Sequence, residues 1–574
     1  DGDVAGGEAV DGAGATGPGD VSGADGDEAT DGGADGSSSD PTAGPVLRAG
    51  GEVIVGSNAL LEALNPHSDP NNEPYVSGHV LPTLIAVEGD FSLVPAVAAE
   101  LPEVVSTDPF TVRWVLRDDA TWDDGTPITW RDVDATWRYI VDPESAAVST
   151  YLYDQITGLD PISDTEFTLS FAQPIGVFRV MFSTNHPLIK ATAYQEHLDG
   201  GGSSADFLQD GLIPFSGGPY RTVGFEPGER VSLRRNDLYW GEPATLERVN
   251  IRRYDSIDDQ IAAVGSGDID VMWVELPAAT EVIRARGLEG VTVTTGPSDF
   301  SFELHFNTRV APLDEVAVRR AIAHAVDRQA IVDVLVQTAT GEPAVPLQSL
   351  VHLPRQSAYS APFAGYGDRA SAERLLDEAG WTFSSPDDEV RTRDGVPLTL
   401  RLLYRDTTVD RLNGEGLAQI LRDQLRRVGI DLELEGVGTS FTSLRAMGDF
   451  DLALDFNFVN SDPAAVGLRY ATDACPPTVE GCDGEPVGAN FDGYSNTEVD
   501  GLIAEAGSTQ DAAARTALFV EIDGLLAGDV PALPLYEGPS FVAHIDDLVN
   551  VDLSASRGGP LARLDEWAYV ALLD

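Results

Sequence analysis

The residues most suggestive of chemistry lie in one stretch, "WDDGTPITWRDVDATWRYIVDPE", which runs from Trp122 to Glu144. It holds five aspartates among three tryptophans. Paired carboxylates can act as general acid and general base, so the stretch is a candidate active site. A structural interpretation competes with this one, because aspartates also stabilise turns and the first turns of helices. The choice between them decides whether the chain is an enzyme or a binding protein.

Other sequence patterns give no support for catalysis. The eight histidines are scattered, and neither H-E-x-x-H nor G-x-S-x-G occurs. A phosphate-binding P-loop is excluded, because the only lysine, Lys190, stands in "LIKAT". The segment "GAGATG", from Gly12 to Gly17, matches a dinucleotide-binding pattern, but no expected strand precedes it and no expected helix follows. We therefore predict no catalytic residue, no metal site and no cofactor.

The chain has two cysteines, Cys475 and Cys482, in "ACPPTVEGCDG". Their spacing, with no histidine nearby, is not typical of a zinc site. The prolines and the glycine between them indicate a loop. We expect a short-range disulfide formed at an oxidising cell surface, and two free thiols are the alternative.

The elements around the aspartate stretch favour the structural interpretation. "FTVRWVL" alternates as a half-exposed strand does, and "DDGTP" supplies a tight turn after it. Thr129 and Asp132 then form the T-x-x-D pattern of a capping box, and apolar residues follow at helical spacing. We therefore expect Asp124 to be a turn residue, Asp132 to lie in the first helical turn and Asp134 to be exposed.

Strands and helices alternate along the rest of the chain. "RVNIRRY" and "IDLELE" predict strands, and "SIDDQIAAVGSGDIDV" predicts a helix, a glycine stop and a strand. "VAVRRAIAHAVDRQAIVDVLV" predicts one long helix, and Gly429 is expected to end another. "NTEVDGLIAEA" predicts a helix opened by a capping box of Thr497 and Asp500. The pattern indicates an α/β or mixed α+β architecture without internal repeats.

Composition narrows the possible partners and the location. The 574 residues carry 94 acids and 36 bases, a formal charge of −58, which excludes nucleic acid and anionic membranes as electrostatic partners. Saline adaptation and a GC-rich genome are alternative origins of this acidity. Residues 1–45 hold eleven acids and no base or aromatic residue, which predicts a disordered acidic tether. No apolar run is long enough to span a membrane, and we expect a signal peptide to have been removed.

Five segments in order resemble the family 5 extracellular solute-binding proteins, the oligopeptide, dipeptide and nickel receptors of ABC importers. Together they extend over nearly all of the chain after Val46, and the resemblance is to actinobacterial-like members of the family. The resemblance also implies a reason for the tether, since such proteins in Gram-positive-type cells are often lipoproteins. The segments are "VRWVLRDDATWDDGTPITWRDVDATWRYI", "SGGPYRTVGFEPGERVSLRRNDLYWG", "FELHFNTRVAPLDEVAVRRAIAHAVDRQAIV", "AERLLDEAGW", and "GDFDLALDFNF" followed by "NFDGYSNTEVDGLIAEA".

The resemblance implies an α/β type II periplasmic-binding-protein fold of the cluster C type. Two lobes close around a ligand by a hinge motion, and lobe one carries an extra subdomain. The chain is expected to cross between the lobes near Asn307 and near Glu537. The implied divisions are the tether at 1–45, lobe one at 46–74, 215–306 and 538–574, the extra subdomain at 75–214, and lobe two at 307–537.

The resemblance also implies a ligand site between the lobes. In peptide-binding members, an aspartate four residues before a proline holds the peptide amine, but here Val459 stands four residues before Pro463. Asp462 and Asn460 are close enough in sequence to substitute for it, and a simple turn at Asp462 is the alternative. Tyr153 matches a cleft tyrosine, and "LLEALNPH" matches the strand whose backbone meets the peptide. The implied ligand-binding residues are Glu62, Ala63, Tyr153, Asn457, Asn460 and Asp462.

The function implied is capture of a solute, with a peptide expected, and its delivery to an ABC permease in the membrane. We expect a monomer that is not an enzyme and does not bind nucleic acid. It would act outside the cytoplasm, at the cell surface or in the periplasm, tethered through a lipidated N-terminus that this chain does not contain. The alternative is a cell-envelope lipoprotein of the same fold that assists glycolipid assembly without feeding a transporter.

Overall fold

The computed structural model describes most of the chain, and Leu47–Asp574 forms one compact unit. The predicted tether, the cysteine pair and Asn460 lie outside the described residues. The described residues are 47–58, 62–68, 76–145, 147, 150, 152–184, 186–209, 211–406, 414–458, 462–474, 488–554 and 559–571.

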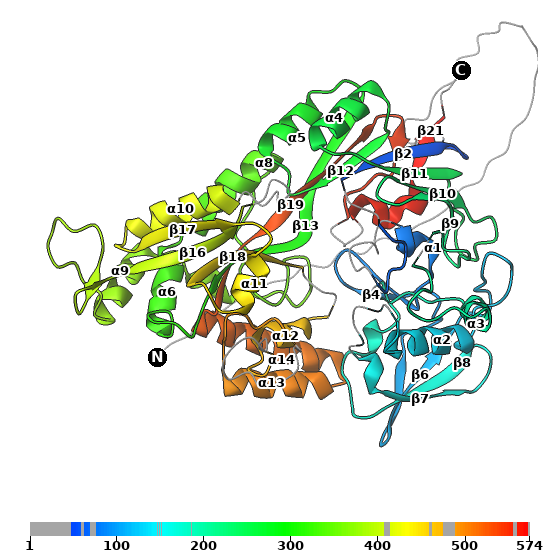
Figure 1. Ribbon diagram of the computed structural model, residues 1–574, viewed down its shortest axis with the longest axis horizontal. Coiled ribbons are helices and arrows are strands. Elements are labelled where there is room, and N and C mark those ends of the chain that lie inside the picture. The colour runs from blue at the N-terminus through cyan, green and yellow to red at the C-terminus, as the bar shows by residue number, and fades with distance from the viewer. Residues whose placement is uncertain are drawn as a thin grey trace, which may run out of the picture. The chain divides into compact units, whose positions relative to one another are not determined.

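A ten-stranded mixed sheet is the main element of this unit (Figure 1). Its order is β17-β16-β18-β13-β19-β12-β2-β11-β10-β9, so strands distant in sequence become neighbours. The strands are β2 (Glu52–Ser57), β9 (Tyr220–Glu226), β10 (Arg230–Arg235), β11 (Arg248–Arg253), β12 (Val271–Glu275), β13 (Val291–Phe306), β16 (Thr399–Arg405), β17 (Asp431–Val437), β18 (Leu452–Phe458) and β19 (Ala532–Ile545).

The long antiparallel pair β13 and β19 contributes to three hydrophobic cores. Val293 of β13 packs against one core together with Ala543 of β19. Further along the same strands, Leu304 and Leu535 are buried in a second core, while Val542 of β19 is buried in a third. The pairing register shifts between Pro297 and Ser301, between these two parts of the pair. One continuous strand pair therefore links these cores, while the predicted lobe boundaries stay a prediction.

A separate four-stranded antiparallel sheet contains β6 (Phe110–Val115), the strand that precedes the aspartate stretch. Helix α2 (Trp130–Val141) forms within the stretch itself. The backbone N–H of Thr129 donates to Asp132 Oδ2 at 2.8 Å, which confirms the predicted capping box. The N–H of Thr126 donates to Asp124 Oδ1 at 3.0 Å, which confirms the predicted turn. The structural interpretation of Asp124 and Asp132 is thus confirmed. Asp134, which was expected to be exposed, is instead half-buried: its side chain is 22% exposed, because it pairs with Nε of Arg138 at 2.7 Å one helical turn later. The strands are β5 (Glu103–Thr107), β6 (Phe110–Val115), β7 (Ile156–Pro161) and β8 (Glu166–Phe171).

Helices flank the large sheet: α4 (Ile257–Ser266) lies beside β12, α5 (Ala279–Arg286) beside β13, and α10 (Gly414–Arg426) beside β16 and β17 (Figure 1). The remaining helices are α1 (Gly78–Val80), α3 (Ala191–Asp199), α6 (Val316–Ala325), α7 (Arg328–Val332), α8 (Thr338–Thr340), α9 (Arg369–Glu378), α11 (Phe441–Ala446), α12 (Ala465–Tyr470), α13 (Thr497–Ser508) and α14 (Ala512–Asp529). The short strands are β1 (Leu47–Arg48), β3 (Ile85–Val87), β4 (Leu93–Pro95), β14 (Thr392–Arg393), β15 (Val396–Pro397), β20 (Leu548–Val549) and β21 (Ala568–Val570).

The predicted glycine stops are confirmed, because Gly267 ends α4 and Gly429, after α10, adopts a φ of 85°. The single long helix predicted from Val316 onward is wrong. It is divided at Val326, whose backbone is extended, into α6 and α7. The side chain of Asp327 accepts from the N–H of Ala330 at 3.0 Å and so starts the second helix. Aspartate favours this capping position over a helix interior.

The predicted capping box of Thr497 and Asp500 is also wrong. Asn496 caps α13 instead, since its Oδ1 accepts from the N–H of Glu498 at 2.9 Å. Asp500 binds outside the helix and accepts from the backbone N–H of Thr472 at 2.8 Å. Asparagine is among the strongest N-cap residues, so it takes the position one residue before the threonine.

Candidate ligand-binding site

The end of β18 carries the first of the predicted ligand residues. Asn457 pairs in register with Ser301 of β13, whose hydroxyl donates to Glu303 Oε1 at 2.9 Å. The side-chain Nδ2 of Asn457 is buried and has no hydrogen-bond partner among the described residues. A buried amide donor without a partner is costly, so a ligand acceptor placed here would stabilise it. Val459 and Asn460 follow outside the described residues.

Asp462 is already engaged in a bidentate ion pair. Arg515 of α14 donates from Nη1 to Asp462 Oδ2 at 2.9 Å and from Nη2 to Asp462 Oδ1 at 2.5 Å. The N–H of Ala464 also donates to Asp462 Oδ1 at 2.8 Å, which is the turn that the sequence offered as the alternative role. Both charged side chains are largely shielded from solvent, with exposures of 11% for Arg515 and 16% for Asp462. The negative charge of Asp462 is therefore balanced without a ligand.

His352 adds a neutral imidazole near this pair. Burial lowers the pKa of His352 to about 4, against the opposing attraction of the Asp462 carboxylate. Its Nδ1 is buried and lacks a hydrogen-bond partner among the described residues. Near neutral pH, His352 thus offers hydrogen bonds but no charge.

A network of buried charged side chains connects β13, the neighbour of β18, to α11 and α12. It was not predicted from the sequence. Glu303 of β13 is 1% exposed and pairs with Arg469 Nη1 at 3.3 Å. His305 Nδ1 lies 2.7 Å from Asp492 Oδ2, and Arg445 Nη2 donates to the other oxygen of Asp492 at 2.9 Å. Burial, the largest effect, would raise the pKa of Asp492, but His305 and Arg445 together hold it below the ordinary value. The network fixes α11 and α12 to the sheet and gives the region a rigid polar support.

The remaining predicted ligand residues lie elsewhere. Tyr153 is 2% exposed and packs in a different core from those of Ala543 and Leu304, and its hydroxyl accepts from the N–H of Phe182 at 2.7 Å. Glu62 is exposed, with its carboxylate beside Gly228, and Ala63 is half-buried. The structure thus brings Asn457 and Asp462 to one region, and the ligand roles of all these residues stay predictions.

Contacts join the segment predicted as the extra subdomain to the segment predicted as lobe two. The N–H of Gly176 donates to the carbonyl oxygen of Gly507 at 2.7 Å, and Arg179 Nη1 donates to the carbonyl oxygen of Gln510 at 3.1 Å. A Cβ added to Gly176 would lie only 2.9 Å from Nε of Arg515. The Asp462–Arg515 pair is therefore next to the surface where these two segments meet.

Comparison with known proteins decides what kind of protein has this architecture. The model of bacterial extracellular solute-binding proteins, family 5, matches residues 92–475. The chain belongs to this family. Its architecture is the type II periplasmic-binding-protein fold, and the family consists of extracytoplasmic solute-binding proteins rather than enzymes. Among the described residues, no helix is both long and apolar enough to cross a membrane.

Similar proteins include peptide and nickel receptors. The oligopeptide-binding protein OppA of Mycobacterium tuberculosis is 29% identical over 78% of this chain and 72% of its own length. The nickel-binding periplasmic protein of Escherichia coli is 24% identical over 85% of this chain and 89% of its own. The solved structure of the periplasmic EDTA-binding protein EppA has a TM-score of 0.79 at 24% identity, covering 92% of this chain and 98% of its own. AppA of Bacillus subtilis, solved with a nonapeptide, has a TM-score of 0.68 at 18% identity, covering 92% and 100%.

Proposed function

We propose that this protein captures a peptide between two lobes and delivers it to an ABC-type permease in the membrane. The mycobacterial relative named as an oligopeptide-binding protein supports the peptide class, and the neighbour solved with a nonapeptide is compatible with it. The contacts between Gly176 and Gly507 and between Arg179 and Gln510 support a closed arrangement of the two predicted parts. Ligand contacts to both parts would favour that arrangement over an open one.

The observation that carries the ligand proposal is the ion pair of Asp462 with Arg515. A buried ammonium costs several kcal/mol unless a carboxylate balances it. Val459 cannot supply that charge, and the charge of Asp462 is already balanced by Arg515. We therefore propose that the peptide's amino group is not anchored at Asp462. It is either blocked or placed where water still reaches it, and Asn457 binds the peptide through its unpartnered amide.

The test begins with native mass spectrometry of gently purified protein, which identifies the retained ligand. Matched peptides with a free or an acetylated N-terminus are then titrated by calorimetry. We expect a peptide to be recovered and acetylation to change the dissociation constant by less than about fivefold, which is under about 1 kcal/mol. Recovery of a glycolipid would instead support the cell-envelope role. A loss of affinity of a hundredfold or more on acetylation would show that an amine anchor exists.

A further inference from the structure

A short hairpin of β3 and β4 holds a phenylalanine, Phe91, in an unusual backbone conformation. The two strands pair antiparallel, and Ile85 of β3 is fully buried in the core that contains Tyr153. The turn between them is closed by the N–H of Phe91, which donates to the carbonyl oxygen of Glu88 at 2.8 Å. Phe91 has a φ of 65°, in the left-handed region that bulky residues rarely adopt. Strained residues of this kind are concentrated at functional sites, so the placement of this ring calls for a functional reason.

The ring of Phe91 lies against Arg355, which comes from a distant part of the chain. Cζ of Arg355 is 5.0 Å from the centroid of the ring, which is a cation–π distance. The side chain of Arg355 is only 16% exposed, and such contacts are stronger when they are shielded from water. Nearby in sequence, Val351 is buried in the core of Leu304. The hairpin belongs to the predicted extra subdomain and Arg355 to predicted lobe two, so the contact joins two parts that pack on different cores.

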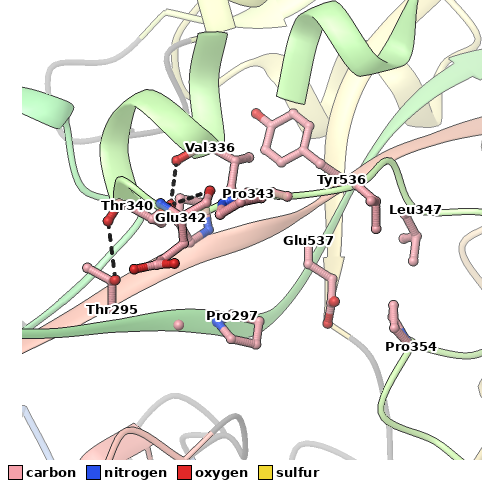
Figure 2. Close-up of a pocket in the computed structure, with 14 residues that line it drawn as sticks. Thr295, Pro297, Val336, Thr340, Glu342, Pro343, Leu347, Pro354, Tyr536 and Glu537 are labelled. Carbon is pink, nitrogen blue, oxygen red and sulfur yellow. Dashed lines mark hydrogen bonds between the residues drawn. The ribbon is translucent and has the colours of Figure 1, made fainter. Parts of the chain in front are cut away.

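Arg355 is also bonded to both strands of the pair that links the cores, β13 and β19, near their shift in register. Its Nη1 donates to the carboxylate of Glu537 on β19, and its Nη2 donates to the carbonyl oxygen of Ser298 on β13 at 3.3 Å. Figure 2 shows Glu537 and Pro354, the residue before Arg355, lining one pocket against β13. A guanidinium donates in its own plane, so its face stays available to an aromatic ring. The cation that meets the ring is therefore fixed to the strands at the predicted crossing near Glu537.

The contact should exist only while the two parts are closed. A hinge motion at the crossing strands would carry the hairpin away from lobe two, while Arg355 stays bonded to Glu537 and Ser298. Arg355 remains a cation at neutral pH, because an arginine is protonated there even when burial lowers its pKa, as it does here. An interaction that is made in only one of two arrangements shifts the equilibrium toward that arrangement. The bond between Gly176 and Gly507 is a second contact between the same predicted parts, and it can report on their separation.

We propose that Phe91 and Arg355 form a latch that favours the closed arrangement before a solute binds. The latch raises the affinity for every solute by the same factor, because a solute that binds the closed arrangement no longer has to bring about all of the closure. Phe91 is a positioning residue, which acts through Arg355 and the strands to which Arg355 is bonded. This inference rests on the proposed closing of two lobes and not on the peptide class of the solute.

The test measures closure without any solute. The full chain is unfolded in guanidinium chloride, freed of small molecules by gel filtration and refolded. Hydrogen exchange of the Gly176 amide then reports closure, because this N–H donates to the carbonyl oxygen of Gly507 at 2.7 Å. Phe91→Asn removes the ring, and asparagine tolerates the left-handed backbone that the turn requires. We expect Gly176 to exchange about tenfold faster in this variant, which is about 1.4 kcal/mol and within the range of a cation–π contact. The radius of gyration in small-angle scattering should increase as well.

Two variants and an internal reference serve as controls. Phe91→Tyr keeps the ring and should exchange at the wild-type rate. Phe383→Ala removes a 42% exposed ring that lies 4.7 Å from Cζ of Arg391 inside predicted lobe two, so it should leave the exchange of Gly176 unchanged. Amides of β6 should exchange at the same rate in all four proteins, which separates opening from general destabilisation.

Wild-type exchange of Gly176 in Phe91→Asn would overturn the latch, and so would equal acceleration in Phe91→Tyr and Phe91→Asn. Either result would leave the proposed function standing, because peptide recovery and titration test that function separately. Protection of Gly176 equal to that of the β6 amides in all four proteins would contradict lobe closure itself, and with it both proposals.

Discussion

Asp523 on α14 should make the protein less stable as the pH rises from about 4 to about 7. Its side chain is fully buried, and it accepts from the N–H of Leu350 at 3.0 Å and from the hydroxyl of Ser360 at 3.2 Å. Burial is the main cause that raises the pKa of Asp523 to about 6 from the ordinary 3.8, against the hydrogen bonds it accepts. The carboxyl group holds in place the segment that carries His352 and Arg355.

The size and direction of the effect follow from these two pKa values. Below about pH 4, Asp523 is protonated in the folded and the unfolded chain, and its contribution to stability is fully present. Between pH 4 and pH 6 the unfolded chain releases this proton while the folded chain retains it, so the free energy of unfolding falls. At about 1.4 kcal/mol for each pKa unit, the loss above pH 6 reaches about 3 kcal/mol.

The assay compares Asp523→Asn with the wild type by urea unfolding across this pH range at constant ionic strength. Asparagine keeps an acceptor for Leu350 and cannot ionise, so the variant should gain about 3 kcal/mol relative to the wild type between pH 4 and pH 7.5. Glu521→Gln, an exposed change on the same helix, should leave the difference flat. Parallel curves for Asp523→Asn and the wild type would refute the reasoning.

Four other predictions concern the ligand, the salt response and the cysteines. Asp462→Asn leaves Arg515 unpaired, so urea unfolding should show a loss of about 3 kcal/mol. In calorimetry, Asp462→Asn should lower the affinity for free-amine and acetylated peptides by the same factor relative to the wild type. A larger loss for the free-amine peptide would contradict this prediction. Cognate ligand should shrink the radius of gyration in small-angle scattering; identical profiles would count against lobe closure. Thermal stability should rise from 0.1 M to 1 M sodium chloride, as the Debye length falls from about 10 Å to about 3 Å, and a flat response would argue against halophily. If Cys475 and Cys482 form a disulfide, the unreduced protein should take up no alkyl group when it is treated with an alkylating agent and its intact mass is measured. Uptake of two alkyl groups would disprove the disulfide.

Local chemistry made part of the fold predictable. The capping box of Thr129 and Asp132 and the glycine stop at Gly267 depend on neighbouring residues alone, so the sequence was sufficient to place them. The break at Asp327 and the cap at Asn496 were missed because two local signals competed. Helical periodicity continued through Asp327, and Thr497 matched a capping pattern as well as Asn496 did. In each case the stronger capping residue determined the boundary.

The candidate site was less predictable, since its pairs join residues far apart in the chain. Glu303 and His305 alternate with Phe302 and Leu304 on β13, a pattern that predicts an exposed polar face, although both faces of the strand are buried here. Their partners could not be read, because Arg469 and Asp492 are separated from them by 166 and 187 positions. The pairing of Asp462 with Arg515 over 53 positions was hidden in the same way. Such pairs depend on the sheet order, which local patterns do not specify.

Because β13 and β19 run continuously from the core of Ala543 to the core of Leu304, we expect that the two predicted lobes cannot be separated as independently folding modules. A cut near the predicted crossovers would leave each fragment with unpaired backbone groups along an open strand edge, which invites association with other chains. Fragment expression, circular permutation and insertion of reporter domains should therefore avoid 291–306 and 532–545. Exposed turns such as the one after Glu226, between β9 and β10, leave this pair intact.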